Sequence, residues 1–275
     1  MNIAVVGAGY AGLGVTWHLL QRGCRVSVFD GGVGASHVST GLLHSAPGKW
    51  GRPTWRAKEG MEAAKELLEV AGGSCFVPSG ILRFAPKKEW IAEGITVFSK
   101  RYLQGLKKAC SQAHFEAHFV KSLSELDSFD QIVLTVGADT LSWVDLPLSK
   151  TIGQCLVCKV KEPLPYTLLG TGHISVTEDP SICLVGSTYE HTERPDPQKA
   201  LALLPQLAAI YPAARDFEVL EILSGVRISP KVGIRPVVQK VDKNVWVFTG
   251  LGSRGLIYHS LLAKSLADEI LSANL

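Results

Sequence analysis

Three glycines and one acid near the N-terminus have the residue types and spacing of a phosphate-binding site. Gly7, Gly9 and Gly12 form the pattern G-x-G-x-x-G, and Asp30 follows after a second apolar run. In this pattern the first glycine allows a tight turn, the second lets the backbone approach a pyrophosphate, and the third lets a helix pack closely on a strand. Asp30 can accept hydrogen bonds from ribose hydroxyls. The pattern predicts an adenine-dinucleotide site without separating FAD from NAD; the alternative is a glycine turn in an ordinary strand–helix–strand unit.

The elements around these residues are those that the pattern requires. Residues 3–6 predict a short buried strand that leads directly into the glycines. Residues 13–22 have one apolar helical face, and Gly23 ends that helix. Residues 25–29 predict a second strand, which closes at Asp30. A bound pyrophosphate would therefore meet the positive N-terminal end of a helix.

Two later apolar runs also end in glycines. Residues 132–136 end at Gly137, and residues 245–249 end at the segment 250–255. Ligands bind at the carboxyl ends of strands in parallel sheets. A long amphipathic helix is predicted after the second run, and its N-terminus can stabilise negative charge on a reduced flavin ring. Small and hydroxylic residues at 34–43 suit a loop that lies against phosphates or a flat ring, or simply a Gly/Ser-rich turn.

Short motifs in a definite order run along most of the chain. They lie at residues 7–30, 34–36, 39–43, 79–83, 133–138, 185–190, 225–227 and 250–256. Together they resemble the D-amino-acid oxidase-like family of FAD oxidoreductases, which includes glycine and sarcosine oxidases. The resemblance implies an FAD cofactor. A covalent flavin link occurs in this family, but no cysteine follows Cys183 and His37 is out of register with the known attachment histidine, so we expect non-covalent FAD.

The resemblance assigns FAD contacts to the N-terminal turn, to the acid and the loop after it, and to three later segments. The cofactor-binding residues that it implies are Gly7, Ala8, Gly9, Tyr10, Ala11, Gly12, Asp30, Gly31, Ala35, Ser36, Ser39, Thr40, Gly41, Leu42, Val120, Val136, Gly137, Gly252, Ser253, Arg254, Gly255 and Leu256.

The resemblance also implies an α/β fold with a discontinuous FAD-binding Rossmann-like domain and a second, smaller, mostly β substrate domain. The FAD-binding domain would comprise residues 1–75, 94–150 and 224–275, and the substrate domain residues 76–93 and 151–223. Within the substrate domain the sequence predicts strands at residues 153–160, 167–176 and 182–188 and one helix at residues 197–210. The family usually has further helices and strands between residues 84 and 98, so we expect a reduced substrate domain and a more open flavin face.

The family reaction implies three candidate catalytic residues. A hydride leaves the carbon next to an amine for flavin N5, and the imine then hydrolyses. Arg227 matches the carboxylate-binding arginine of the family, since a guanidinium can hold a carboxylate with two hydrogen bonds; an ordinary salt bridge is the alternative. Arg254 lies in the flavin-side turn, where it reaches flavin or substrate or else faces solvent. Tyr189 is expected at the rim of the site, or else in the core.

The sequence does not decide whether the substrate is a small molecule or an RNA. Residues 187–190 and 252–256 look most like the FAD oxidase domain of the bifunctional enzyme that modifies the wobble uridine of tRNA, where it removes a carboxymethyl group as glyoxylate. Residues 49–58 mix cations with two tryptophans, which suits RNA, although tryptophans usually pack on a core. A free amino acid such as glycine or sarcosine is the rival substrate. An FAD-binding protein that has lost turnover and an NAD-dependent dehydrogenase are the other classes.

Composition limits the remaining possibilities. The chain has 275 residues, 46% of them hydrophobic, and a net charge of +3 that is too small to indicate nucleic acid by itself. No apolar run reaches the length of a membrane span and no signal peptide is evident, so we expect a cytoplasmic protein. Cys155 and Cys158 lie three apart on a predicted strand and point to opposite faces, which predicts two core residues and no metal site. Nothing in the sequence indicates the oligomeric state.

Overall fold

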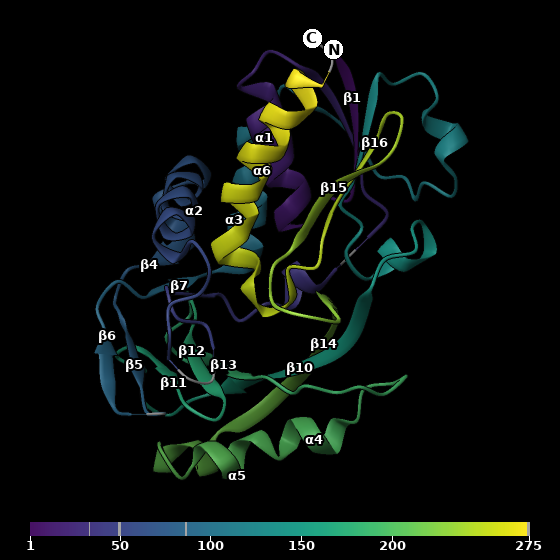
Figure 1. Cartoon of the computed structure of the whole chain (residues 1–275). Coiled ribbons are helices and arrows are strands. Elements are labelled where there is room, and N and C mark those ends of the chain that lie inside the picture. Colours follow the sequence, from purple (N-terminus) through teal and green to yellow (C-terminus); the bar gives the residue numbers. More distant parts are fainter. Residues whose placement is uncertain (33, 49–50, 86, 274–275) are drawn as a thin grey trace.

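The computed structural model describes residues 1–275 apart from residues 33, 49–50, 86 and 274–275. Apolar runs of the chain assemble into two large sheets (Figure 1). In Figure 1 one sheet and its long helices occupy the upper part, with both termini at the top. The second sheet lies below, and the short helices α4 (Pro197–Leu201) and α5 (Leu203–Leu207) lie underneath it.

The upper sheet has six strands, most of them buried on both faces. In spatial order they are β15 (Val237–Asp242), β16 (Val245–Thr249), β9 (Gln131–Leu134), β1 (Asn2–Val6), β2 (Arg25–Phe29) and β8 (His114–Glu116). β15 runs antiparallel to β16, and every other neighbouring pair is parallel. Parallel strands need crossover connections and cover on both faces, which explains their nearly continuous apolar runs. The predicted α/β fold is confirmed.

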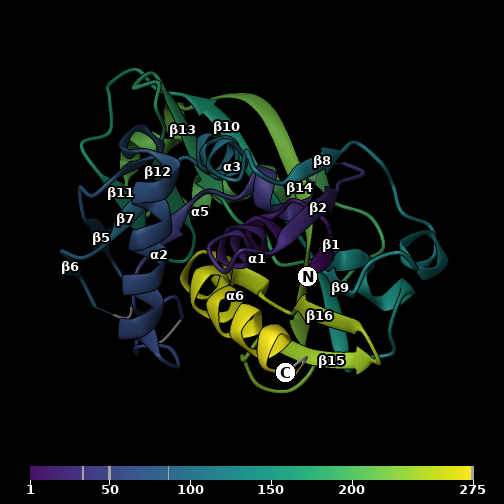
Figure 2. The same ribbon diagram turned by 90° about the horizontal axis from the view of Figure 1, so that it is seen from above.

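Four long helices provide much of that cover. They are α1 (Tyr10–Leu20), α2 (Ala57–Ala71), α3 (Ser99–Ala109) and α6 (Gly255–Ser272). α6 packs along α1 and against α2, as Figure 2 shows from above. The amphipathic helix predicted after residues 245–249 is α6, and Leu262, Leu266 and Ile270 on its apolar side are all buried.

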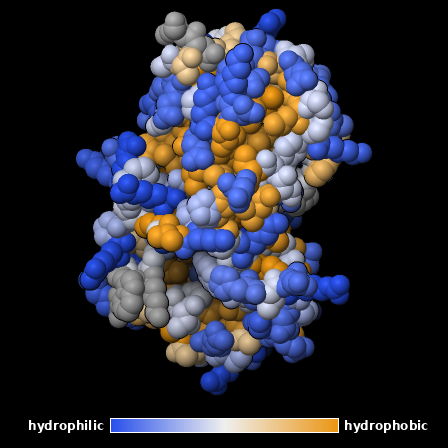
Figure 3. Space-filling model, turned by 45° about the vertical axis from the view of Figure 1, so that its right-hand side comes forward, coloured by the Kyte–Doolittle hydropathy of each residue, from blue (hydrophilic) through white to orange (hydrophobic). Residues whose placement is uncertain are grey.

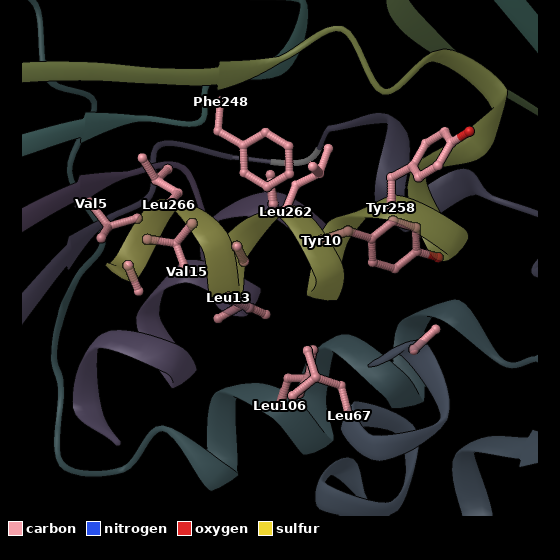
Figure 4. Packing of buried hydrophobic residues seen from close by; sticks show 14 of the residues in the cluster. Val5, Tyr10, Leu13, Val15, Leu67, Leu106, Phe248, Tyr258, Leu262 and Leu266 are labelled. Atoms are coloured by element: carbon pink, nitrogen blue, oxygen red, sulfur yellow. The ribbon is translucent and has the colours of Figure 1, made fainter. Parts of the chain in front are cut away.

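Alternation along β1 divides its side chains between two hydrophobic clusters. Ile3 and Val5 join the cluster beneath the helices, whereas Ala4 and Val6 join the cluster on the other face of the sheet. Figure 4 shows Val5 and Leu13 within the first cluster. Full burial of an aliphatic side chain of this size contributes about 1.5–3 kcal/mol. The two clusters therefore hold β1, and with it the glycine turn that follows, in a fixed place.

The lower sheet has seven strands. In spatial order they are β14 (Glu218–Pro230), β10 (Leu148–Lys159), β13 (Ile182–Gly186), β12 (His173–Val176), β11 (Thr167–Leu169), β5 (Ile81–Arg83) and β6 (Glu89–Ile91). One face of this sheet packs on α4 and α5 through a separate cluster that includes Leu156, Ile174, Val185 and Leu207. The long strands β10 and β14 connect this layer to the upper sheet (Figure 1).

Two predicted elements of this layer are wrong in detail. The single strand expected at residues 167–176 is a pair of antiparallel strands, β11 and β12, because the chain reverses at residues 170–172, where two glycines flank Thr171. The single helix expected at residues 197–210 is two short helices divided at Ala202. Pro205 lacks the N–H that a continuous helix requires and crowds the preceding turn, which explains the break.

Smaller elements complete the chain. A three-stranded sheet consists of β3 (Leu42–Leu43), β7 (Ile95–Val97) and β4 (Phe76–Val77). The short 3₁₀ helices are η1 (Ala35–Val38), η2 (Gly73–Cys75), η3 (Leu123–Leu126), η4 (Gly137–Ser142), η5 (Pro212–Asp216) and η6 (Gly252–Arg254). The domain boundaries expected from the sequence stay a prediction.

The cysteines are structural. All six are buried and free, and Cys158 lies opposite Cys183 on the neighbouring strand. Cys155 and Cys158 are both buried, as predicted. Across the part of the chain that the structure describes, no cluster of three or more His, Cys, Asp or Glu side chains is arranged to hold a metal ion. Among the same residues, no helix combines the length and the apolar character needed to span a membrane.

Candidate functional site

A cavity of about 1240 Å³ lies between the two sheets. Its upper wall is formed by the carboxyl ends of β1, β2, β9 and β16 and the segments that follow them, and its lower wall by one face of β10, β12 and β14. Figure 3 shows a hollow in the surface between the upper and lower parts of the molecule. Pockets for small ligands usually measure about 300–1,000 Å³, so this cavity is large enough for an extended cofactor together with a substrate.

The glycine turn after β1 has the geometry that its sequence predicts. Gly7 has φ +100°, which side chains other than glycine rarely adopt, and a Cβ there would lie 2.7 Å from the carbonyl oxygen of Thr135. A Cβ at Gly12 would overlap the carbonyl oxygen of Gly7, so this position allows α1 to pack on the turn. Gly9 caps α1 without a side-chain hydrogen bond. The N-terminus of α1 therefore presents its dipole to the cavity.

Two side chains fix the turn from outside. The Asp30 carboxylate accepts a hydrogen bond from the Ala8 N–H at 3.1 Å, and the Ser36 hydroxyl accepts one from the Tyr10 N–H at 3.2 Å. Asp30 closes β2 next to β1, where the ribose of a bound dinucleotide would lie. These bonds hold in place the backbone that would contact a pyrophosphate.

Most of the predicted cofactor-binding residues line this cavity. Those that do are Gly7, Ala8, Gly9, Tyr10, Ala11, Asp30, Gly31, Ala35, Ser36, Ser39, Thr40, Leu42, Val120, Val136, Gly137, Gly252, Ser253, Gly255 and Leu256. Gly12 and Gly41 lie behind the wall, where a Cβ at Gly41 would overlap the carbonyl oxygen of Val97. Their part is to let backbone segments approach each other, and the binding roles of the whole set stay predictions.

The turn before α6 brings a third segment to the cavity. Gly252 has φ +53° and approaches the Ser229 hydroxyl, and α6 begins at Gly255. Arg254 does not line the cavity, unlike its neighbours Ser253 and Gly255. Its Nε is buried and has no hydrogen-bond partner among the described residues. Direct contact between Arg254 and a substrate therefore has no support in this geometry.

Arg227 occupies the opposite wall. Its Nη2 donates to the Ser187 hydroxyl at 2.8 Å and its Nη1 donates to the Thr188 carbonyl at 3.1 Å. The ring of Tyr189, which is 62% exposed, lies 4.7 Å from the guanidinium. A side chain at position 153 would overlap this guanidinium, so Gly153 lets Arg227 lie across β10. No described carboxylate forms an ion pair with Arg227, which leaves a cation in the cavity held only by neutral acceptors.

A buried carboxylate organises the segment that holds Arg227. Glu190 is 2% exposed and accepts hydrogen bonds from the Gln154 side chain at 2.7 Å, the Asp196 N–H at 3.0 Å and the Thr188 hydroxyl. The Thr188 hydroxyl also accepts from the Gln154 N–H at 2.9 Å. This network fastens the end of β13 to β10, and so it fixes the carbonyl that receives Arg227.

Several other residues line the cavity without a role assigned from the sequence, among them Arg83 and His173. Arg83 is 2% exposed, pairs with Glu89 at 3.2 Å and donates to the Ala46 carbonyl at 2.6 Å, so its charge is already balanced. Burial, with the nearby charge of Arg227, lowers the pKa of His173 to about 3. Burial also lowers the pKa of His44 to about 4. Period-2 alternation along β5 and β12 could have placed Arg83 and His173 on the cavity face of the lower sheet.

The basic and aromatic segment expected to suit RNA is only partly described, because Lys49 and Trp50 lie outside the described residues. Trp55 is half-buried and packs on the hydrophobic cluster beneath the helices, with its ring 6.0 Å from that of Tyr258. Arg235 lies over the same ring at 4.9 Å. Core packing, the alternative weighed for these tryptophans, therefore accounts for Trp55.

The residues present fit an FAD molecule. A narrow glycine turn at a helix N-terminus suits the pyrophosphate, and the acid at the end of β2 suits the adenosine ribose. The turn after β16 and the start of α6 line the same cavity, and Gly252 approaches Ser229 on β14, the strand that carries Arg227, so a flavin ring would be placed here. The cavity is continuous between these places, as a dinucleotide requires.

Comparisons with known proteins agree with this geometry. The sequence model of the family described as FAD dependent oxidoreductase (DAO) matches residues 2–95 and 88–269. Among solved structures, the chain is similar to iminodiacetate oxidase from Chelativorans sp. BNC1, with 17% identity and a TM-score of 0.83 over 98% of this chain and 95% of that chain. It is also similar to glycine oxidase from Geobacillus kaustophilus, with 19% identity and a TM-score of 0.78 over 98% and 94%. L-proline dehydrogenase from P. horikoshii gives 14% identity and a TM-score of 0.79 over 99% and 93%. At these identities the likeness concerns the fold, and no curated protein matches the chain.

Proposed function

Because the chain belongs to the FAD dependent oxidoreductase (DAO) family, we propose that it oxidises the carbon–nitrogen bond of a small amine that carries a carboxylate. The observation that carries this proposal is the position of Arg227 in the wall opposite the glycine turn, where it pairs with no carboxylate among the described residues. Glycine oxidase and iminodiacetate oxidase, two proteins of similar fold, act on substrates of this class by their names. That likeness supports the proposal and does not replace its test.

The two walls of the cavity have different roles in the proposed reaction. FAD, when bound, would supply the acceptor for a hydride from the carbon next to the substrate nitrogen. Arg227 binds the substrate carboxylate through a planar pair of N–H groups, and Ser187 and Thr188 hold the guanidinium in one orientation. Tyr189 covers the guanidinium at the mouth of the cavity and reduces its hydration. Binding at a fixed distance from the flavin-side turn orients the reacting carbon.

We propose that FAD is held without a covalent bond. The cysteines of the chain are buried, and only Cys155 lines the cavity, where its thiol donates to the Val38 carbonyl at 3.5 Å. Denaturation in acid should therefore release all of the flavin into solution. Flavin that stays with the precipitated chain would contradict this part of the proposal.

The carboxymethylaminomethyl group of a tRNA wobble uridine is the second candidate substrate, because it presents the same amine and carboxylate to the cavity. Exposed cations at Arg52, Arg56 and Lys58 favour it. The packing of Trp55 on the core and the pairing of Arg56 with Glu59 at 2.7 Å argue for the small molecule instead. We therefore place the free amine first.

A substrate panel tests the proposal. Purified protein reconstituted with FAD is mixed without oxygen with glycine, sarcosine, iminodiacetate, proline and undermodified tRNA, and flavin bleaching is followed. A small carboxylate-bearing amine should bleach the flavin and release a keto or aldehyde acid. Bleaching by tRNA alone would select the second candidate. A yellow protein that none of these amines reduces would indicate an FAD-binding protein without turnover.

A further inference from the structure

Phe119 is an exposed aromatic residue in the wall of the cavity. Its side chain is 60% exposed and lines the cavity. It belongs to none of the three hydrophobic clusters and makes no ring contact with another described aromatic residue. An aromatic ring left in water loses the free energy that its burial would supply. The fold of this chain therefore gives no account of why position 119 is aromatic.

The loop that carries Phe119 is held on both sides. His118 is bonded to the Glu125 carboxylate at 2.7 Å, and Val120 is buried in the cluster on the outer face of the upper sheet. Glu125 also accepts hydrogen bonds from the N–H groups of Lys121 and Ser122, at 2.7 and 3.0 Å. The ring thus stands on a fixed backbone, and a ligand that stacks on it does not have to order the loop first.

The position of the ring relates it to the dinucleotide turn. Phe119 follows the carboxyl end of β8, which pairs in parallel with β2, so both strands end at the same edge of the sheet. A Cβ at Gly31 would lie 2.6 Å from the Phe119 ring, which shows that the ring packs closely on the residue after Asp30. Asp30 is the acid placed for the adenosine ribose, and the base attached to that ribose lies next to it.

We propose that Phe119 is the stacking platform for the adenine base of FAD, and that it makes this chain select the dinucleotide over a flavin mononucleotide. The inference rests on the FAD dependence of the family and is independent of the proposed amine substrate. Stacking of a base on an aromatic side chain is worth about 1–3 kcal/mol by alanine substitution, which corresponds to about a 5- to 150-fold change in affinity.

Trp143 also lines the cavity and is a second aromatic candidate. It is half-buried and packs with Val136, Val144 and Leu146 on the outer cluster of the upper sheet. Burial therefore explains why position 143 is aromatic. It does not explain why position 119 is aromatic. Replacing Trp143 is expected to lower stability and to weaken FAD and FMN alike.

Binding measurements on stripped protein test the proposal. FAD, FMN and AMP are titrated into wild type, Phe119→Ala, Phe119→Trp and the control Trp90→Ala, which removes an exposed aromatic residue from the lower sheet. Phe119→Ala should weaken FAD and AMP about 5- to 150-fold and leave FMN within about twofold. Phe119→Trp should retain the wild-type affinity for FAD. The rate at which FAD leaves the holoprotein, followed by flavin fluorescence, should rise by a similar factor in Phe119→Ala.

Three outcomes overturn the proposal: unchanged FAD affinity in Phe119→Ala, an equal loss for FAD and FMN, or an equal loss in Trp90→Ala. Because the side chain is mostly exposed, thermal unfolding of Phe119→Ala should match wild type, so a loss of the fold does not hide the result. The amine assay plays no part here, and an inactive protein that still binds FAD leaves this test intact.

Discussion

The two walls of the cavity are built on different principles. The upper wall recognises its ligand with backbone: glycines, helix N-termini and two side chains that hold the turn. The lower wall uses side chains on strands, with Arg227 held by Ser187 and Thr188 and the Thr188 hydroxyl bonded in turn to Glu190. Backbone recognition requires particular residues to be small, and side-chain recognition requires particular groups to meet. The first requirement can be seen in a linear sequence, whereas the second depends on strands that are distant in the chain.

The largest effect is expected at a glycine of the upper wall where a side chain has no room. Gly12→Val would push its side chain into the carbonyl group of Gly7 and separate α1 from the turn, at a cost of more than about 4 kcal/mol. The protein should lose its flavin and much of its stability. The matched control is Gly34→Ala, because Gly34 lines the same cavity and a Cβ there meets no atom within 4 Å. Flavin absorbance per chain and thermal unfolding measure both variants, and equal behaviour of the two would remove the distinction between a packed and an open glycine.

A substitution in the lower wall should affect the reaction with substrate. Arg227→Ala is expected to lower kcat/KM for a carboxylate-bearing amine by about 10²- to 10³-fold, equivalent to about 3–4 kcal/mol, because the substrate carboxylate loses its cation. Flavin content should stay at the wild-type level. Arg215→Ala removes an exposed arginine beyond the lower sheet and serves as the control. Loss of flavin in Arg227→Ala would show that the two walls are not separable.

Acid should destabilise the protein through buried histidines in α1, in α6 and in the cavity wall. Burial lowers the pKa of His18, His44 and His259 to about 4 from an unfolded value of about 6.5. The stability from each neutral ring is complete above about pH 6.5 and is lost as the pH falls toward 4, by up to about 3 kcal/mol per histidine. Urea unfolding between pH 7.5 and 4.5 should show this decline.

The variant His18→Gln isolates one contribution, since the side chain of His18 forms no hydrogen bond with the described residues except a long one of 3.5 Å with Ser260. Its free energy of unfolding should fall less steeply with acid than that of wild type, while the two proteins stay close at pH 7.5. Parallel curves for the two proteins would show that His18 titrates alike in the folded and unfolded chain.

The smallest expected effect concerns the support of Arg227. Glu190→Gln keeps the shape of the side chain but weakens the hydrogen bonds to the Thr188 hydroxyl and the Asp196 N–H. KM for a carboxylate-bearing amine should rise about 10-fold, which is about 1.4 kcal/mol, with kcat and flavin content little changed. The exposed Glu193→Gln is the control. A fall in kcat with KM unchanged would mean that Glu190 acts on something other than the placement of Arg227.

Prediction from the sequence succeeded where a local pattern of residues determines the structure. The N-terminal strand, turn, helix and second strand lie where the glycine spacing placed them, and the last strand matches residues 245–249. It failed in detail where a single residue interrupts a pattern, as with Pro205 in the helix and the glycines between β11 and β12. Arg254 is not among the residues that line the cavity, and its role stays a prediction.

What the sequence determined alone was the dinucleotide turn, because steric demands on Gly7 and Gly12 leave a mark at a fixed spacing whatever surrounds them. Only the tertiary structure decided which side chains are neighbours. Pairing of β10 with β14 places Arg227 across Gly153, and pairing of β2 with β8 places Phe119 beside Gly31. Register between distant strands arises from the cores that bury them, so no short stretch of sequence contains it.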